Sequence, residues 1–230
     1  MDFFTKIIEL FSNPKYIEII FEGFKLTLLI SVAAAILGLL LGTVVAIVTI
    51  SKTNRWTRIP KLLCTIYITI IRGTPMALQL FIMVYVIFAI RGFPTELTAI
   101  LAFGINSGAY VAENIRAGIL SVDIGQTEAG RALGLNSGVT MLRIVIPQAI
   151  KNVIPAIGNE LIALIKETSI VSMIGLFDLT MGAKIIGSGN NMASYLVPMV
   201  VVALFYLAIV YTLTFVIKLI EKRLRASDKR

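Results

Sequence analysis

Long runs of apolar residues without a single charge dominate the chain. Residues 26–50 and residues 193–217 contain no Asp, Glu, Lys or Arg. Each run is longer than the about 20 residues that a helix needs to cross about 30 Å of hydrocarbon. Both are too long for the apolar core of a cleavable signal peptide, and no small-residue cleavage site follows the first. The pattern predicts permanent transmembrane helices.

The remaining apolar runs predict three more crossings. Residues 62–90 are apolar except for Arg72-Gly73-Thr74-Pro75 in their middle. A straight helix over this whole run would overshoot the bilayer at about 1.5 Å per residue, so we expect a break at Gly73 and Pro75. We therefore predict an all-α integral membrane protein in which residues 1–230 form a single transmembrane domain. Its five transmembrane helices are expected at about 24–50, 74–90, 95–120, 152–165 and 193–220.

The N-terminal segment differs from these spans. Residues 1–22 mix large apolar side chains with charged ones, and Pro14 interrupts them. Such a pattern is typical of short amphipathic turns that lie at the membrane surface. We therefore expect an interfacial N-terminal segment over residues 1–22.

The placement of charge indicates the topology. The chain has a net charge of +8 and a mean hydropathy of +0.91. Lys52, Arg55, Arg58 and Lys61 follow the first span without any acidic residue between them, as is typical of cytoplasmic loops. The N-terminus is therefore predicted outside, and five crossings place the basic tail, residues 221–230, in the cytoplasm. This clustering beside the spans also argues against nucleic acid as a partner.

The inventory of reactive residues excludes several classes of chemistry. The chain has one cysteine, Cys64, and no histidine, so an internal disulfide, a zinc site and a thiol-based catalytic centre are not expected. Cys64 lies in an apolar run and is interpreted as a packing residue. The sequence also lacks the G-x-x-x-x-G-K-[S/T] phosphate-binding loop, so any ATP must be bound by another subunit. We predict that the chain is not an enzyme and carries no cofactor.

The loop at residues 121–150 is too polar to span the membrane and carries the most specific pattern. Residues 128–135 suit a short helix, with Glu128 in its first turn and Gly134 or Gly138 to end it. A second short helix is expected to stop at Pro147. A helix–turn–helix on the cytoplasmic face has the form of a docking element.

This loop resembles the "EAA" motif of permeases from binding-protein-dependent ABC importers, E-A-A-x3-G-x9-I-x-L-P. Glu128, Ala129, Gly134, Ile144 and Pro147 match at the required spacings, whereas Gly130 and Ile146 replace an Ala and a Leu of the motif. The resemblance implies a coupling helix that sits in a groove of the ATPase subunit. Its implied coupling residues are Glu128, Ala129, Gly130, Arg131, Ala132, Leu133, Gly134 and Leu135.

The resemblance extends from about residue 23 to residue 223 and implies the partners. The Arg72-Gly73-Thr74-Pro75 sequence and residues 109–126 are similar to the branch that transports polar amino acids. A transporter of this kind pairs with a second permease, identical or a sibling, within the lipid of the cytoplasmic membrane. Two ABC ATPase subunits bind ATP and Mg, and an extracytoplasmic solute-binding protein delivers the amino acid.

Ionisable residues at membrane depth are candidate substrate contacts, because they are costly in hydrocarbon and usually face a cavity. Glu113 and Arg116 are three apart on a helix, and an ion pair between them is favoured over substrate contact. Lys166 and Asp178 are further candidates. Arg72, beside the predicted break, either pins the bent span or contacts substrate.

Glu160 and Glu167 lie seven residues apart, so one face of the predicted fourth span is acidic. Carboxylates there are suited to a cationic side chain such as a guanidinium, although Glu160 could equally pair with a neighbouring helix. Additional polar positions that could line the same path are Thr74, Asn106, Thr168 and Ser169. These residues favour arginine, lysine or histidine as cargo. A glutamine or glutamate importer and a partner-independent channel or ion-coupled carrier are the alternatives.

Overall fold

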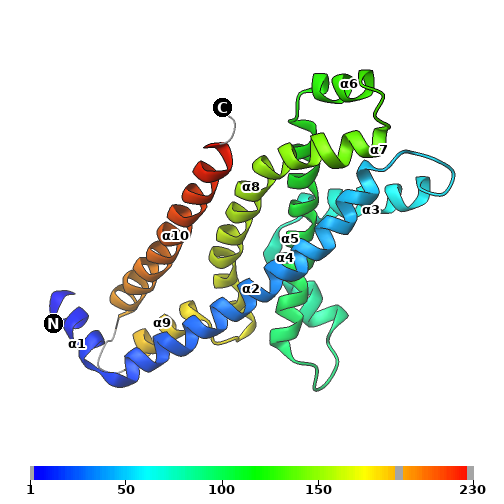
Figure 1. Cartoon of the computed structure of the whole chain (residues 1–230). Helices are drawn as coiled ribbons and strands as arrows, with labels where there is room; N and C mark the ends of the chain where they lie inside the picture. Colours follow the sequence, from blue (N-terminus) through cyan, green and yellow to red (C-terminus); the bar gives the residue numbers. More distant parts are fainter. Residues whose placement is uncertain (1–2, 190–193, 227–230) are drawn as a thin grey trace. The chain divides into compact units, whose positions relative to one another are not determined.

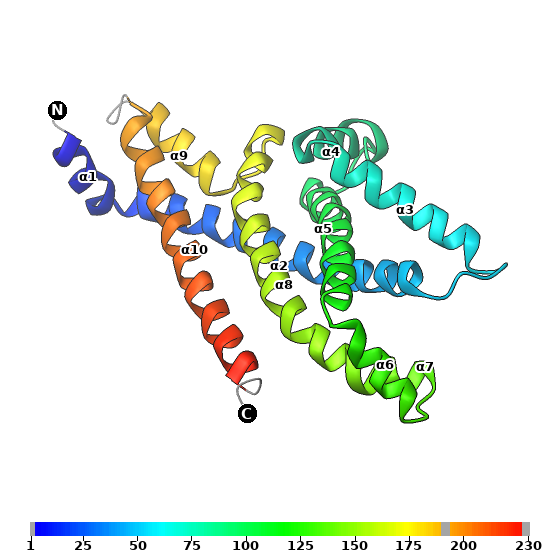
Figure 2. The ribbon, with the colours of Figure 1, turned by 90° about the horizontal axis from the view of Figure 1, so that it is seen from above.

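The computed structural model describes residues 3–189 and 194–226, and every regular element in them is a helix (Figures 1 and 2). The α-helices are α1 (Phe3–Ser12), α2 (Pro14–Ile50), α3 (Arg58–Gly73), α4 (Met76–Ile82), α5 (Thr95–Leu120), α6 (Ile124–Ala132), α7 (Ser137–Thr140), α8 (Ile146–Glu167), α9 (Leu179–Ser188) and α10 (Leu196–Arg225). Met83–Ile87 and Met141–Val145 are π-helical, and Thr168–Ile174 forms a 3-10 helix. The all-α prediction is confirmed.

Two helices, α2 and α10, are long and apolar enough to cross a membrane on their own. Two pairs qualify together as bent spans. Arg58–Gly73 and Met76–Ile87 meet at 110°, and Ser137–Ile174 and Leu179–Ser188 meet at 49°. The described residues therefore contain two such helices, or up to four spans if each bent pair counts as one. The predicted crossing at 95–120 coincides with α5. The count of five crossings stays a prediction.

The break between α3 and α4 falls where the sequence predicted it. Thr74 leaves the helix in an extended conformation, with φ −123° and ψ 148°, and its Oγ1 donates a hydrogen bond of 2.8 Å to the carbonyl of Ile70. The residue before a proline is pushed toward this conformation by the pyrrolidine ring. Pro75 therefore explains the end of the helix.

The helical structure breaks at Asn13, directly before Pro14, as the sequence predicted. The expected boundary near residue 22 was wrong, because α2 begins at Pro14 and continues for 37 residues to Ile50. Proline is tolerated at the first helical position, because the N–H that it lacks has no partner within the helix there. Only α1 is a separate element, and its Leu10 is fully buried against α9 and α10.

The chain divides into two compact units, each with its own core. The first comprises Met1–Ala35, Met76–Phe103 and Leu161–Thr212, and the second comprises Ile36–Pro75, Gly104–Glu160 and Leu213–Arg230. Phe103, Leu80 and Leu164 are fully or almost fully buried in the first unit. In the second unit Ala46 and Ala112 are buried, and the hydroxyl of Tyr67 donates a hydrogen bond of 2.5 Å to the carbonyl of Ile105.

Close packing of α2 on α9 in the first unit depends on Gly23. A Cβ atom there would lie 2.6 Å from the carbonyl oxygen of Asp178, and backbone cannot move aside as a side chain can. We expect Gly23→Ala to lower the free energy of unfolding by about 1–3 kcal/mol, the usual cost of overpacking. Thermal unfolding in detergent measures the effect. Gly73→Ala is the matched control, because no atom lies within 4 Å of its new Cβ. Equal unfolding midpoints for the two variants would contradict this packing argument.

Candidate functional site: an exposed docking helix

The local sequence defines both ends of α6. The Asp123 carboxylate accepts a hydrogen bond of 2.6 Å from the backbone N–H of Gly125, which caps the first turn. Because this cap starts the helix at Ile124, Glu128 lies in its middle and not in its first turn. Residues 128–132 of the predicted coupling helix are therefore helical, and residues 133–135 form the turn that follows.

Gly134 ends α6, as its position in the sequence predicted. Its φ is +81°, in the left-handed region that L-residues with a side chain rarely adopt. The N–H of Gly134 donates to the carbonyl of Arg131 at 3.0 Å, and that of Leu135 donates to the carbonyl of Gly130 at 3.2 Å. This pair of bonds is a Schellman motif, which satisfies the last carbonyls of the helix.

The return path from α6 differs from the prediction. Asn136 caps α7 through a hydrogen bond of 2.9 Å from the N–H of Val139. The second helix does not stop at Pro147, because the helical path continues from Ser137 through the π-helical segment into α8. In this segment the N–H of Ile146 bonds to the carbonyl of Met141, five residues back. The wider π-helical turn accommodates a proline at the second position of α8.

One side of α6 packs on the chain, and the other is open. Gly130 is buried, and a Cβ atom there would lie 2.9 Å from both the Ile144 Cδ1 and the Thr140 Cγ2. Glu128, Ala129, Arg131 and Ala132 are exposed. Leu133, next to them, is 82% exposed. The exposed patch of α6, formed by Glu128, Ala129, Arg131, Ala132 and the adjacent Leu133, therefore combines apolar and charged side chains.

Two hydrogen bonds connect this region to the longer helices of the same unit. Gln148 on α8 donates to the Gln126 side chain on α6 at 3.3 Å. Asn152 on α8 donates to the Ser121 hydroxyl at the end of α5 at 2.9 Å. Figure 1 shows α6 beside α7, at the ends of α5 and α8 that these bonds join. A displacement of α6 therefore acts on α8 through Gln126 and Gln148, and α8 is in turn bonded to the end of α5.

The charged residues of α5 form the predicted ion pair. The Arg116 guanidinium donates two hydrogen bonds to Glu113, from Nε to Oε2 at 2.9 Å and from Nη2 to Oε1 at 2.5 Å. Arg72 lies 3.9 Å from the same carboxylate and stacks over the Tyr110 ring, 5.3 Å from its centroid. These contacts agree with the interpretation of Arg72 as a residue that pins the bent span.

The candidate substrate residues fall in both units. Glu167, Thr168 and Ser169 belong to the first, and Arg72, Thr74, Asn106 and Glu160 belong to the second. Glu167 is half-buried at the end of α8. Thr168 is fully buried, and its hydroxyl donates to the Ile165 carbonyl at 2.7 Å, so it is already engaged.

The remaining candidates of the second unit also have partners. Asn106 is buried, and Glu160 is half-buried. Both interact with other groups of the chain.

Sequence reasoning missed Lys184. This half-buried residue on α9 donates a hydrogen bond of 3.1 Å to the Ser172 hydroxyl, which in turn donates to the Ser169 carbonyl at 3.0 Å. The ammonium thus lies close to the candidate Ser169. The sequence feature that could have identified Lys184 is that it is the one charged residue in the run 179–188.

No metal site is apparent in the described parts of the chain, residues 3–189 and 194–226, where no three His, Cys, Asp or Glu side chains are grouped. The long apolar helices and the bent helix pairs of residues 3–189 and 194–226 have the length and composition of an integral membrane protein. Residues 38–226 match the family described as "Binding-protein-dependent transport system inner membrane component", and the chain belongs to this family.

The relatives are permeases of amino-acid transporters. The chain is 41% identical over 214 residues to "Arginine transport system permease protein ArtQ" of Bacillus subtilis (strain 168), which covers 92% of this chain and 95% of ArtQ. It is also 41% identical over 217 residues to "Putative glutamine transport system permease protein GlnP" of Rickettsia bellii (strain RML369-C), covering 94% of this chain and 96% of GlnP.

Solved structures agree. The "Crystal structure of an amino acid ABC transporter with histidines" matches with a TM-score of 0.85 and 38% identity, over 97% of this chain and 99% of that one. An inward-facing MetNI methionine ABC transporter matches with a TM-score of 0.75 and 20% identity, over 92% of this chain and 99% of that one, a likeness of fold alone. The chain is thus an amino-acid ABC transport permease and not an enzyme, and the ATPase is a separate subunit.

A substitution at Gly134 tests whether its positive φ holds the C-terminal turn of α6. Gly134→Ala forces a Cβ into the left-handed region at a cost of about 1–2 kcal/mol, so the C-terminal turn of α6 should fray. Hydrogen exchange of the amides of residues 130–135 should become faster. The matched control is Gly138→Ala, whose Cβ would meet its nearest neighbour, the Asn136 Oδ1, at an ordinary 3.5 Å. If both variants exchange alike, the positive φ does not hold the turn.

Proposed function

We propose that this chain forms half of the translocation pore of an ATP-driven importer for basic amino acids, namely arginine, lysine or histidine. The observation that carries the proposal is the exposed patch of α6, next to Leu133, on an element bonded to α8, which is itself bonded to the end of α5. Such a patch is suited to a groove on an ATPase subunit. Membership of the family agrees with import driven by a binding protein.

The proposed assembly contains two permeases, because one chain alone is not sufficient to form a pore. A single protomer with five crossings encloses no path, so the pore forms between two permeases, identical or siblings. Each α6 docks on one ABC ATPase subunit, and that subunit binds ATP and Mg. An extracytoplasmic solute-binding protein delivers the amino acid to the outer loops.

Coupling uses the connections of α6. When ATP closes the ATPase pair, the two docked helices move together. The bond that Gln148 donates to Gln126 passes this movement to α8, and the bond that Asn152 donates to Ser121 connects α8 to the end of α5. The spans then open outward, and hydrolysis restores the inward-facing state.

The proposed orientation places the N-terminus outside and the C-terminus in the cytoplasm. The basic segment 51–61, α6 and the end of α10 then lie on the cytoplasmic side. Lys222, Arg223 and Arg225 in the last turn of α10 agree with the excess of cations in cytoplasmic segments. The membrane is the cytoplasmic, or inner, membrane.

The choice of a basic cargo rests on the carboxylates of α8. Glu160 and Glu167 are both half-buried, and a buried carboxylate prefers a cationic partner. The relative named for arginine and the solved transporter with histidines support this choice. The relative named for glutamine supports the second candidate, a glutamine or glutamate importer.

The docking role predicts the effect of a charge reversal on α6. Glu128→Lys should leave the chain inserted but abolish ATP-dependent uptake, because an exposed residue of the docking patch then repels or misplaces the ATPase. Uptake into proteoliposomes, with co-purification of the ATPase as a second readout, measures this. Glu96→Lys is the control, since Glu96 is also exposed but lies in the first turn of α5. Normal uptake by Glu128→Lys would refute the docking role, and so would normal uptake after deletion of the loop 121–150, as a partner-independent carrier requires.

The cargo assignment predicts a change in selectivity. Glu160→Gln and Glu167→Gln should each lower arginine uptake relative to glutamine uptake by about tenfold or more, since a hydrogen bond to a charged group is worth about 1.5–3 kcal/mol. Uptake of the two radiolabelled amino acids by the same vesicles gives the ratio. Glu18→Gln, at an exposed position of α2, should leave it unchanged. If the ratio of arginine uptake to glutamine uptake is unchanged in both α8 variants, these carboxylates do not select the cargo and have a structural role.

A further inference from the structure

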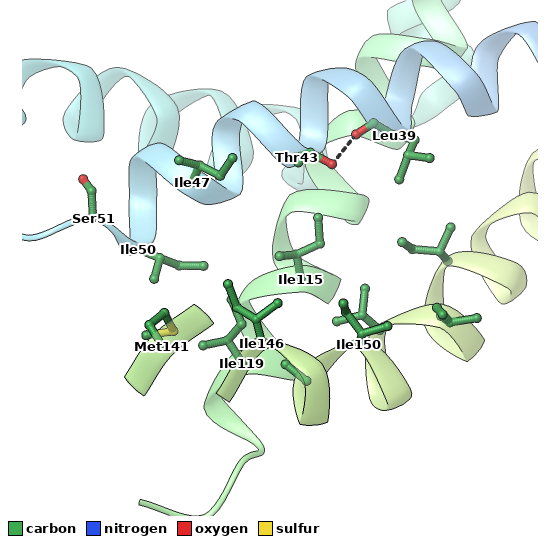
Figure 3. Close-up of a pocket in the computed structure, with 14 residues that line it drawn as sticks. Leu39, Thr43, Ile47, Ile50, Ser51, Ile115, Ile119, Met141, Ile146 and Ile150 are labelled. Carbon is green, nitrogen blue, oxygen red and sulfur yellow. Dashed lines mark hydrogen bonds between the residues drawn. The ribbon is translucent and has the colours of Figure 1, made fainter. Parts of the chain in front are cut away.

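The second unit contains an aliphatic groove that the transport mechanism does not use (Figure 3). Its volume is about 640 Å³. The walls come from the end of α2 (Leu39 to Ser51), the end of α5 (Ile115 and Ile119) and the segment from Met141 to Ile157. A groove of this size falls within the range of ligand-binding pockets, and its lining decides which occupant fits.

The walls of the groove offer no free hydrogen-bonding group. Two hydroxyl groups belong to its lining, and each donates a hydrogen bond to a backbone carbonyl three or four residues earlier in the sequence. Thr43 donates to the Leu39 carbonyl at 2.6 Å, as Figure 3 shows, and Ser51 donates to the Val48 carbonyl at 2.8 Å. The other lining side chains are aliphatic or methionine. Water is poorly held by such a surface, so the occupant is apolar.

The length of the groove distinguishes between apolar occupants. From Leu39 to Ile50 the helix rises by about 16 Å, at about 1.5 Å per residue. This is about half of the about 30 Å of hydrocarbon that a transmembrane helix of a second copy would cross. A single acyl chain from one leaflet fits this length.

Cations lie where the groove reaches the end of α2. Ser51 begins the segment 51–61, which has four cations and no acidic residue. The Lys61 ammonium donates to the Ser51 carbonyl and, at 3.0 Å, to the Thr53 hydroxyl. Lys52, next to Ser51, is exposed. Positive charge at the mouth of an apolar groove favours a negatively charged headgroup.

We propose that the aliphatic groove binds one acyl chain of an anionic phospholipid, whose phosphate lies beside Lys52. This proposal rests on the proposed topology in one respect, the assignment of the lipid to the cytoplasmic leaflet. The groove is walled by α8 and the end of α5, the helices that hold α6. A bound lipid therefore packs against the elements that transmit the movement of the ATPase.

Native mass spectrometry of the full-length chain in mild detergent tests this site, with phosphatidylglycerol and phosphatidylethanolamine as competing probes. The wild type should retain phosphatidylglycerol in preference. Ile47→Trp and Ile150→Phe fill the groove from two walls and should lower this retention at least fivefold. Leu63→Trp is the matched control, because Leu63 is an exposed apolar residue of α3 outside the groove. Lys52→Gln should weaken phosphatidylglycerol binding about fivefold and remove the preference, whereas Lys222→Gln in the tail should not.

Equal phosphatidylglycerol retention by Ile47→Trp, Ile150→Phe and Leu63→Trp would overturn the proposal. So would a loss of dimer in Ile47→Trp without a change in bound lipid, since the occupant would then be a second copy. Equal retention of phosphatidylglycerol and phosphatidylethanolamine by the wild type would contradict the headgroup site at Lys52. Lipid retention does not depend on transport, so arginine uptake by the same preparations reports separately on the proposed function.

Discussion

Hydrocarbon offers no partner to a backbone N–H or C=O, so a membrane-spanning chain must satisfy these groups itself. This requirement accounts for the helices, and it also sets the form of their interruptions. At the start of α9 the Asp178 carboxylate accepts from the N–H groups of Thr180 and Met181 at 3.1 and 2.9 Å. The N–H of Leu179 donates to the Thr27 hydroxyl on α2 at 3.3 Å. Side chains thus replace the missing helical bonds, and the bend costs little.

The same requirement makes α6 a defined element outside the apolar spans. Asp123 satisfies its first turn, and the left-handed Gly134 satisfies its last carbonyls. A short helix with both ends capped keeps its shape without deep burial. Its exposed side is therefore available to a partner, while the bond between Gln126 and Gln148 connects it to α8. A stiff surface element of this kind is what mechanical coupling to a separate ATPase needs.

Local rules were enough to predict much of this structure. The break at Pro75, the end of α6 at Gly134 and the pairing of Glu113 with Arg116 all follow from residue types and spacing. Pro147 misled, because a π-helical turn accommodates it within a helix that continues. Pro14 follows a break as predicted, but as the first residue of α2 it begins a long helix. The aliphatic groove and the position of Lys184 depend on how distant segments pack, and no spacing in one sequence reveals that.

We propose that this permease moves a basic amino acid only when a separate ATPase hydrolyses ATP. The decisive experiment measures ATP hydrolysis by the ATPase, reconstituted in liposomes with the permease and the binding protein, across a panel of amino acids. We expect stimulation by arginine, lysine or histidine and none by neutral or acidic amino acids. Stimulation by glutamine or glutamate alone would contradict the choice of cargo. Amino-acid flux through the chain without any ATPase would contradict the account as a whole.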